Sequence, residues 1–332
     1  MVSISDVEAA IAEKGTMIDR ELEKFLPRKK GDSLYEAVWY HMATGGKRIR
    51  PALALMACEA VGGDSRKAVP WAAACELLHN WLLVHDDIED SDEVRRNQPT
   101  VWKKYGVPHA INVGDLMSQK VFQLVLDSKS SKVDDRITMQ LLSLMAETAI
   151  RTAEGQAMDI SMRGREPSEK EYMEMVTGKT AYYLTAPIIG GALIGGAGRK
   201  DMERIIEFGR YAGPAFQITD DVLDLTEGKG RGEIGRDIKE GKRSIMAIHC
   251  LSRCTPGEKR SILEILDKRP EDTTADDVRF VKAMFERYRS VEYSSKKAEE
   301  LMAKAKHAIK PLPDDLRGLL EMFADYLISR KR

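Results

Sequence analysis

Residues 75–96 read CELLHNWLLVHDDIEDSDEVRR, a nonpolar run that ends in clustered acids and two arginines. If this run is helical, Asp86 and Asp90 share one face with their Cβ atoms about 5–6 Å apart, and Asp87 lies roughly 100° around the axis. Carboxylates about 4 Å apart repel by about 4 kcal/mol at an effective dielectric near 20, so a proton or a cation must neutralise them. An all-oxygen donor set favours Mg²⁺ or Ca²⁺ over Zn²⁺. A solvated helix end with an acidic loop is the alternative.

The same acidic pattern occurs a second time. Residues 216–224 read FQITDDVLD, so Asp220, Asp221 and Asp224 repeat the spacing directly after the nonpolar run 205–218. Two such clusters, each following a nonpolar helix, are hard to explain as surface decoration. If both helices line one cavity, the clusters can face each other and hold a polyphosphate through several divalent ions.

Two basic segments carry groups that suit phosphate. The first is GGKRIRP at residues 45–51, whose paired glycines let the backbone come close to a ligand. A helix starting at Pro51 would add backbone N–H groups for an anion. The cations of this segment are Lys47, Arg48 and Arg50. The second segment is Arg95–Arg96, which offers planar guanidinium forks. A basic surface loop is the alternative for the first segment.

Single residues near these segments are further candidates. His79 lies about two turns before Asp86 on the expected helix, although one histidine in a nonpolar run is more often a packed core residue. Trp81 lies ~7.5 Å along the helix axis from Asp86. Its ring would form the floor of a pocket that opens at the aspartates, with an ordinary core position as the alternative. Gly178, Lys179 and Thr180 interrupt another helical run, which suggests ligand contact, with an ordinary kink as the alternative.

Composition narrows the class of protein. The chain has 332 residues and a formal net charge of −1, so no global basic field favours nucleic acid. With 43% hydrophobic and 32% charged residues it fits a soluble globular protein, and its abundant helix formers predict an all-α fold. No linker is apparent, so we expect one domain over residues 1–332.

Compartment and membrane association are inferred from cysteines and hydropathy. None of the four cysteines has zinc-finger spacing, and no signal peptide is apparent, which predicts reduced thiols in the cytoplasm. Residues 181–198 resemble a membrane span, but Pro187 and five glycines favour a buried bundle helix. We expect no transmembrane segment.

Nonpolar periodicity and helix breakers predict helices over residues 3–26, 34–43, 51–61, 68–85, 112–126, 135–158 and 170–194, and three or four more within residues 244–332. We expect the 170–194 helix to break near Pro187, the 135–158 helix to end at Gln156 and Asp159, and residues 97–100 to turn. Breaks in the last region are expected near Pro256, 269–274 and 311–313.

Glycines and charges make residues 226–243 a candidate lid over phosphates. Its cations are Lys229, Arg231, Lys239, Lys242 and Arg243. A disordered surface loop is the competing interpretation.

Taken together, these motifs resemble the trans-polyprenyl diphosphate synthases, most closely the archaeal-type short-chain enzymes that make farnesyl or geranylgeranyl diphosphate. The resemblance spans nearly the whole chain and includes GQAMDI, GKTAYYL and EGKRS. It implies the isoprenoid synthase fold, an all-helical bundle around a deep central cavity, and a homodimer. It also implies Mg²⁺-assisted ionisation of an allylic diphosphate, condensation with isopentenyl diphosphate, and proton elimination.

The resemblance also implies roles for individual residues. Three Mg²⁺ ions would be bound by Asp86, Asp87, Asp90, Asp220, Asp221 and Asp224. The allylic diphosphate would contact Arg95, Lys179 and Lys242. Isopentenyl diphosphate would contact the Gly46 backbone, Lys47, Arg50, His79 and Arg96. Thr180 and Gln217 would face the allylic carbocation.

Product length in the resembled family depends on bulk just before the first aspartates, where Trp81 and Leu82 stand. That pattern implies geranylgeranyl diphosphate as the product, with farnesyl diphosphate as the alternative, and Trp81→Ala is expected to lengthen it. Asn97 replaces a common glycine, and Glu233 replaces a lysine that commonly opens the lid motif. Ser244 replaces a frequent threonine.

Three rival interpretations remain. A terpene cyclase of the same fold would usually keep only one aspartate motif, and GGKRIRP argues for a second diphosphate site. A non-catalytic regulatory subunit of a heterodimer is disfavoured by the intact acidic and basic motifs. A helical scaffold that binds Ca²⁺ would show no turnover.

Overall fold

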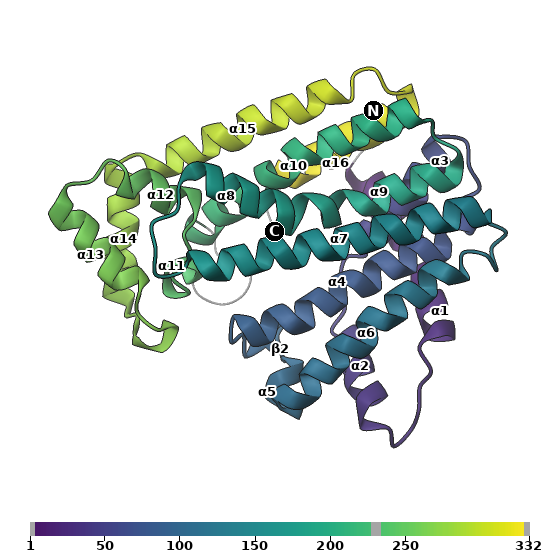
Figure 1. The fold of residues 1–332 in the computed structure, drawn as a ribbon, viewed down its shortest axis with the longest axis horizontal. Coiled ribbons are helices and arrows are strands. Elements are labelled where there is room, and N and C mark those ends of the chain that lie inside the picture. Colours follow the sequence, from purple (N-terminus) through teal and green to yellow (C-terminus); the bar gives the residue numbers. More distant parts are fainter. Residues whose placement is uncertain (1–3, 227–233, 329–332) are drawn as a thin grey trace. The chain divides into compact units, whose positions relative to one another are not determined.

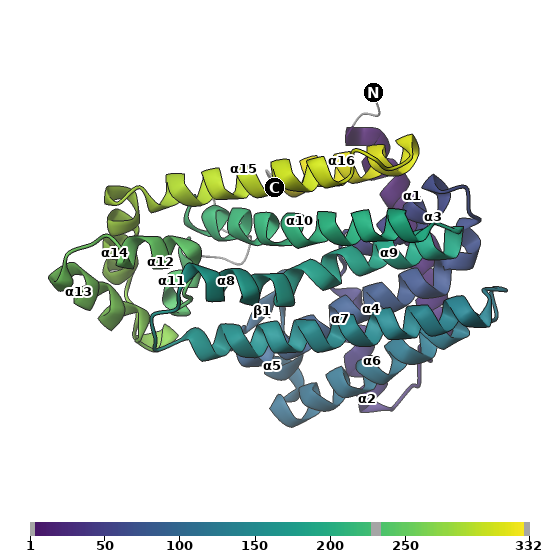
Figure 2. The same cartoon turned by 45° about the horizontal axis from the view of Figure 1, so that its top comes forward.

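The structure is a computed structural model that describes residues 4–226 and 234–328. Almost every element is a helix, so the predicted all-α class is confirmed (Figures 1 and 2). In the described residues the strands are limited to β1 (Val94–Arg95) and β2 (Gln98–Pro99), which pair antiparallel. The lid candidates Lys229, Arg231 and Glu233 lie outside the described residues.

The chain divides into two compact units. Unit 1 comprises residues 1–148, 185–205 and 312–319, and unit 2 comprises residues 149–184, 206–311 and 320–332. Four helices contribute residues to both units: α7 (Asp135–Met162), α9 (Tyr182–Gly195), α10 (Arg199–Thr226) and α16 (Asp314–Ile328). A single domain over residues 1–332 therefore stays a prediction.

Unit 1 is built around helix α4, which is nonpolar on most of its surface and buried along most of its length. The other helices that lie wholly in unit 1 are α1 (Ile4–Phe25), α2 (Ser33–Ala43), α3 (Ile49–Ala60), the 3₁₀ turn η1 (Ser65–Ala68), α5 (Val101–Tyr105) and α6 (Val107–Asp127). Helix α4 itself spans Val69–Glu89. It packs on α6 and α3, and its Trp71 is fully buried. The first acidic motif is thus attached to the most buried helix of its unit.

Helix α9 packs closely on this core. A Cβ at Gly191 would lie 1.9 Å from the carbonyl oxygen of Ala54, and one at Gly190 would lie 2.1 Å from the Trp71 indole. The predicted break near Pro187 is wrong, because α9 continues through it. The Trp71 indole N–H donates to the Pro187 carbonyl oxygen at 3.2 Å. Within the described residues no helix is long and apolar enough to cross a membrane.

Unit 2 carries the second acidic motif near the end of α10. Its other elements are α8 (Glu169–Val176), the π-helical turn η2 (Thr177–Ala181), α11 (Arg236–Lys239), α12 (Ile245–Leu251), α13 (Pro256–Leu266), the 3₁₀ turn η3 (Pro270–Asp272), α14 (Ala275–Arg287) and α15 (Ser290–Ala308). Capping boxes begin α8, α13 and α14, each with a side-chain oxygen bound to the backbone N–H three residues on. Phe208 and Phe323 pack with ring centroids 6.5 Å apart.

Several predicted boundaries need correction. Helix α7 continues past Gln156 and Asp159 to Met162, so these residues lie on a helix instead of ending it. The predicted break near Pro256, by contrast, is confirmed, because α12 ends at Leu251 and α13 begins at Pro256, whose fixed φ suits a first helical turn. Helix α3 begins at Ile49, before Pro51. Helix α11 lies inside residues 226–243, for which the sequence indicated a lid or a disordered loop and no helix.

Candidate active site

The first acidic cluster lies at the C-terminal end of α4. Asp86 and Asp87 belong to its last turn, and Asp90 is the C-cap residue, whose N–H donates to the Asp86 carbonyl oxygen at 2.8 Å. A helix C-terminus carries partial negative charge, so acidic side chains there are electrostatically unfavourable. Asp87 is only 1% exposed. The cluster therefore depends on nearby positive charge.

Arg95 supplies that charge. Its guanidinium contacts the Asp87 Oδ1 atom at 2.5 Å and the Asp92 Oδ2 atom at 3.4 Å. The Thr100 hydroxyl and the Trp102 indole hold the Asp92 carbonyl oxygen at 2.7 and 2.8 Å. The predicted turn at residues 97–100 is in fact part of the β1–β2 hairpin, and this hairpin directs Arg95 back at α4.

The turn of this hairpin also explains why Asn97 can replace the glycine that is common at this position in the resembled family. Arg96 and Asn97 have φ values of 51° and 62°, the left-handed pair expected in a two-residue hairpin turn. Asparagine tolerates this conformation better than other residues with a side chain. Asn97 therefore serves the turn where relatives of the resembled family often have glycine.

Arg95 and Arg96 turn toward different groups although they are adjacent. Arg96 Nη1 lies 3.4 Å from the Thr44 hydroxyl, and a Cβ on Gly46 would lie 3.2 Å from Arg96 Nη2. Gly46 has a φ of 150°, a conformation that favours glycine. The Gly46 backbone and Arg96, both predicted to bind isopentenyl diphosphate, therefore lie together.

Arg48 has a different role from its neighbours in GGKRIRP. It pairs with the buried Glu76 at 2.8 Å and with Asp19 at 2.9 Å. Lys47, by contrast, is exposed. Arg48 was expected to add to the phosphate-binding cations, but the structure uses it to anchor the start of α3 to α1 and α4.

Arg48→Met is expected to lower the free energy of unfolding by about 3–5 kcal/mol, because it leaves the buried Glu76 carboxylate uncompensated. Lys47→Met is the matched control and is expected to change stability by no more than about 0.5 kcal/mol. Urea denaturation measures both. Equal stabilities for the two variants would contradict the anchoring role.

Two histidines lie among these arginines. Burial, then Arg50, Arg96 and Arg95, hold the pKa of His79 well below its ordinary value. Burial, then Arg96 and Arg95, lower the pKa of His41 to about 3. Both imidazoles are therefore neutral at pH 7 and can donate a hydrogen bond without adding charge.

His41, Glu76 and Asn80 are members of this group that the sequence analysis missed. Asn80 Nδ2 donates to the Glu76 carboxylate at 3.0 Å, and burial raises the Glu76 pKa against the opposing effect of Arg48. The available signal was spacing, because Glu76 and Asn80 are four residues apart on the expected helix. His41 could be found only through the packing of α2.

The lowered pKa of His41 predicts a pH dependence of stability. The unfolded chain takes up a proton near the ordinary value of 6.5, whereas the folded chain does so only near 3. The folded state therefore loses stability as the pH falls below 6.5, by about 1.4 kcal/mol per pH unit. Between pH 7 and 5, His41→Gln is expected to lose about 2 kcal/mol less than the parent, as measured by urea denaturation. The exposed His307→Gln is the control, and equal losses for the His41 variant and the parent would contradict the assignment.

The second acidic cluster is held by hydrogen bonds within unit 2. Tyr172 donates its hydroxyl to Asp221 Oδ2 at 3.0 Å, and Gln217 Nε2 donates to Asp221 Oδ1 at 2.9 Å. The Thr180 hydroxyl in turn donates to Gln217 Oε1 at 3.2 Å. Thr180 and Gln217, both predicted to face the substrate cation, thus form one chain with Asp221. Burial and Asp221 raise the Tyr172 pKa well above its ordinary value, so the hydroxyl stays protonated.

Asp224 and helix α11 form the other side of this cluster. The Asp237 backbone N–H donates to Asp224 Oδ2 at 3.0 Å. Lys242 contacts Asp237 at 3.1 Å and Glu240 at 2.7 Å. One small hollow is lined by Asp221, Asp237 and Lys242. The structure therefore brings Lys242, which was predicted to contact the allylic diphosphate, next to the second cluster.

Lys179 lies in the π-helical turn η2 rather than at a break. Its Nζ atom contacts Asp159 Oδ2 on α7 at 2.7 Å. A Cβ at Gly155 would lie 2.1 Å from the Lys179 backbone nitrogen, so this glycine of GQAMDI lets α7 approach the turn. Single π-helical turns occur frequently at functional sites.

The predicted site residues fall into two groups. Unit 1 holds Gly46, Lys47, Arg50, His79, Trp81, Leu82, Asp86, Asp87, Asp90, Arg95 and Arg96, and unit 2 holds Lys179, Thr180, Gln217, Asp220, Asp221, Asp224 and Lys242. The donor set of each acidic cluster is carboxylate oxygen, which fits Mg²⁺ completed by water and phosphate. In the part of the chain that the structure describes, no three acidic, histidine or cysteine side chains already form a metal cage. Metal binding at both clusters stays a prediction.

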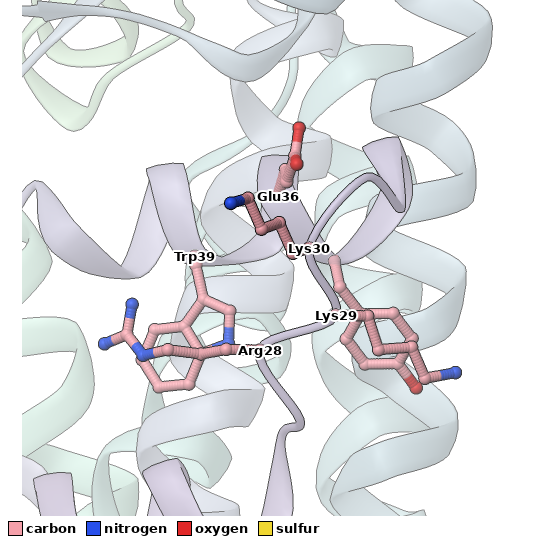
Figure 3. A pocket seen from close by; sticks show the side chains of 6 residues that line it. Arg28, Lys29, Lys30, Glu36 and Trp39 are labelled. Carbon is pink, nitrogen blue, oxygen red and sulfur yellow. The ribbon is translucent and has the colours of Figure 1, made fainter.

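A surface hollow of about 240 Å³ lies elsewhere, beside α2 (Figure 3). It is lined by Arg28, Lys29, Lys30, Tyr35, Glu36 and Trp39. The Arg28 guanidinium stacks 4.0 Å from the Trp39 ring centroid, and Lys29 lies 4.6 Å from that of Tyr35. Both cations already contact aromatic rings of α2. We therefore attribute the hollow to the packing of the preceding loop on α2 and do not assign it a ligand.

Comparison with known proteins agrees with this all-α fold. Residues 32–284 match the family model for polyprenyl synthetase. The short chain isoprenyl diphosphate synthase of Methanothermobacter thermautotrophicus is 34% identical over all of both chains. The geranylgeranyl diphosphate synthase of Methanosarcina mazei is 35% identical over 97% of both. The crystal structure of geranylgeranyl pyrophosphate synthetase from Pyrococcus horikoshii matches with a TM-score of 0.89 at 35% identity, covering 98% of this chain and 99% of that one.

An all-α protein with two aspartate-rich helix ends is thereby placed among the isoprenoid synthases. The chain belongs to the polyprenyl synthetase family and is a prenyltransferase.

Proposed function

We propose that the chain is a short-chain prenyltransferase that condenses isopentenyl diphosphate with allylic diphosphates and makes mainly geranylgeranyl diphosphate. The observation that carries this proposal is the divergence of Arg95 and Arg96. Arg95 lies on the acidic cluster at Asp87, whereas Arg96 lies beside Gly46 and its charge helps to lower the pKa of His79. A condensing enzyme needs two neighbouring diphosphate sites, whereas a cyclase needs one.

The two groups of residues have separate tasks in this proposal. Both aspartate clusters act on the diphosphate of the allylic substrate, with Arg95, Lys179 and Lys242 as further contacts. Bound Mg²⁺, three ions per site, would stabilise the negative charge of the leaving diphosphate. Thr180 and Gln217 present oxygen atoms to the carbocation, and Asp221 holds Gln217 in place.

Isopentenyl diphosphate binds to Lys47, Arg50, Arg96 and the Gly46 N–H. His79 donates a hydrogen bond as a neutral imidazole, because its lowered pKa keeps it uncharged. The arginines then supply the charge, and a neutral donor avoids adding a further cation to a crowded basic site. We also propose a cytoplasmic homodimer, as the family resemblance implies.

The test is turnover by the purified chain alone. It is incubated with Mg²⁺, labelled isopentenyl diphosphate and dimethylallyl, geranyl or farnesyl diphosphate in turn, and the products are separated by chromatography. We expect C20 product from each primer. C15 as the end product would favour a farnesyl diphosphate synthase, and no turnover would favour a regulatory subunit.

A further inference from the structure

Helices α4 and α6 pack on each other (Figures 1 and 2). His85 of α4 contacts Trp81 on its own helix and lies against Gly114 of α6. The Trp81 indole Nε1–H donates to His85 Nδ1 at 3.2 Å. The two rings meet edge to face, with centroids 6.3 Å apart and planes at 82°. An indole N–H can only donate, so Nδ1 must accept and the imidazole hydrogen lies on Nε2. His85 thus fixes the direction in which the indole points.

Gly114 fixes His85 in turn. A Cβ at Gly114 would lie 2.0 Å from His85 Nε2 and 2.4 Å from Cδ2, so no side chain fits there while the imidazole keeps its place. Gly114 is buried inside α6, where glycine is less favourable than alanine. Its backbone φ is not in the left-handed region that requires glycine. The imidazole, and not the backbone conformation, therefore accounts for glycine at this position.

We propose that His85 and Gly114 are positioning residues that set product length by holding the Trp81 ring. This rests on the proposed function and on the expectation, implied by the family resemblance, that the Trp81 ring limits the growing chain. A ring held by packing alone can occupy a second rotamer. A neutral hydrogen bond of about 1 kcal/mol shifts the equilibrium between two rotamers about fivefold toward the bonded one. Loss of the bond releases the ring part of the time, which lengthens part of the product.

The experiment compares three variants with the parent. His85→Leu fills similar space but removes the acceptor, and His85→Asn keeps a carbonyl oxygen close to the position of Nδ1. Gly114→Ala displaces the imidazole. The readout is the ratio of C25 and longer products to C20, with kcat measured alongside and folding checked by circular dichroism. We expect His85→Leu and Gly114→Ala to raise the ratio severalfold and His85→Asn to stay near the parent.

Two additional variants separate positioning from other effects. Asp115→Asn removes the carboxylate that lies 3.9 Å from His85 Nε2, too far for a hydrogen bond, and is expected to leave the ratio unchanged. His85→Leu added to Trp81→Ala should not lengthen the product further, because the ring it positions is gone. The comparison of Trp81→Ala with the double variant tests the proposal even if Gly114→Ala fails to fold.

The outcomes distinguish the two proposals. If the parent makes no prenyl diphosphate, the proposed function fails. If the parent does make it but His85→Leu lowers kcat at an unchanged product ratio, His85 only supports the neighbouring Asp86 and the inference is overturned. An equal shift in His85→Leu and His85→Asn would also overturn it, since the acceptor would then have no role.

Discussion

Asp86→Asn and Asp220→Asn are each expected to lower kcat by about 10²- to 10³-fold, the scale on which one charge-stabilising group contributes in an active site. Both side chains are partly exposed, so their carboxylates are available to a substrate complex. Asparagine keeps the shape and removes the charge. Steady-state assays with geranyl and isopentenyl diphosphate over a range of Mg²⁺ concentrations measure the effect.

Asp86 and Asp220 are chosen because they are among the less buried members of their clusters. Asp87 is paired with Arg95 and Asp221 with Tyr172, and both are buried, so their replacement would also disturb folding. Glu89→Gln on α4 and Glu203→Gln on α10 are the controls, because both side chains are exposed acids on the same helices. Parental turnover in either aspartate variant would remove that cluster from the proposed mechanism.

Trp81→Ala is expected to shift the main product from C20 to C25 and longer. Removal of the indole opens space five residues before Asp86, and one helical turn of added depth corresponds to ~5.4 Å. The remaining site is unchanged, so kcat should fall less than the product ratio changes. Chromatography of dephosphorylated products measures the shift.

Trp39→Ala is the control for this experiment, since Trp39 lies on α2 beneath Arg28. It should leave the product length unchanged. An unchanged C20 product from Trp81→Ala would end the assignment of this residue as a limit on chain length.

The sequence predicted those features that depend on local pattern. Nonpolar periodicity located nearly all helices, and the nonpolar runs before the aspartates placed Asp86 and Asp220 near the ends of α4 and α10. The interruption at Lys179 is a real irregularity, although it is a π-helical turn. Pro187 misled because a proline can remain inside a helix that is packed on other helices, here against Trp71.

Features that depend on distant packing were not predictable. The sequence gives no reason to treat Arg48 differently from the neighbouring cations Lys47 and Arg50. Its structural role follows only from its ion pair with Glu76, which is buried on another helix. The divergence of Arg95 and Arg96 depends on the hairpin turn at Asn97. His41 joins the basic group because α2 packs on α4, and Gly114 could be linked to His85 only through the packing of α6 on α4.

The central claim is that both aspartate clusters hold one diphosphate. The most direct measurement is calorimetric binding of an unreactive allylic thiodiphosphate in Mg²⁺ to the parent, Asp86→Asn, Asp220→Asn and the double variant. We predict that each single variant loses at least about tenfold in affinity and that the double variant loses little more, a coupling of about 1 kcal/mol or greater. Losses that simply add, or an unchanged affinity in either single variant, would contradict the account.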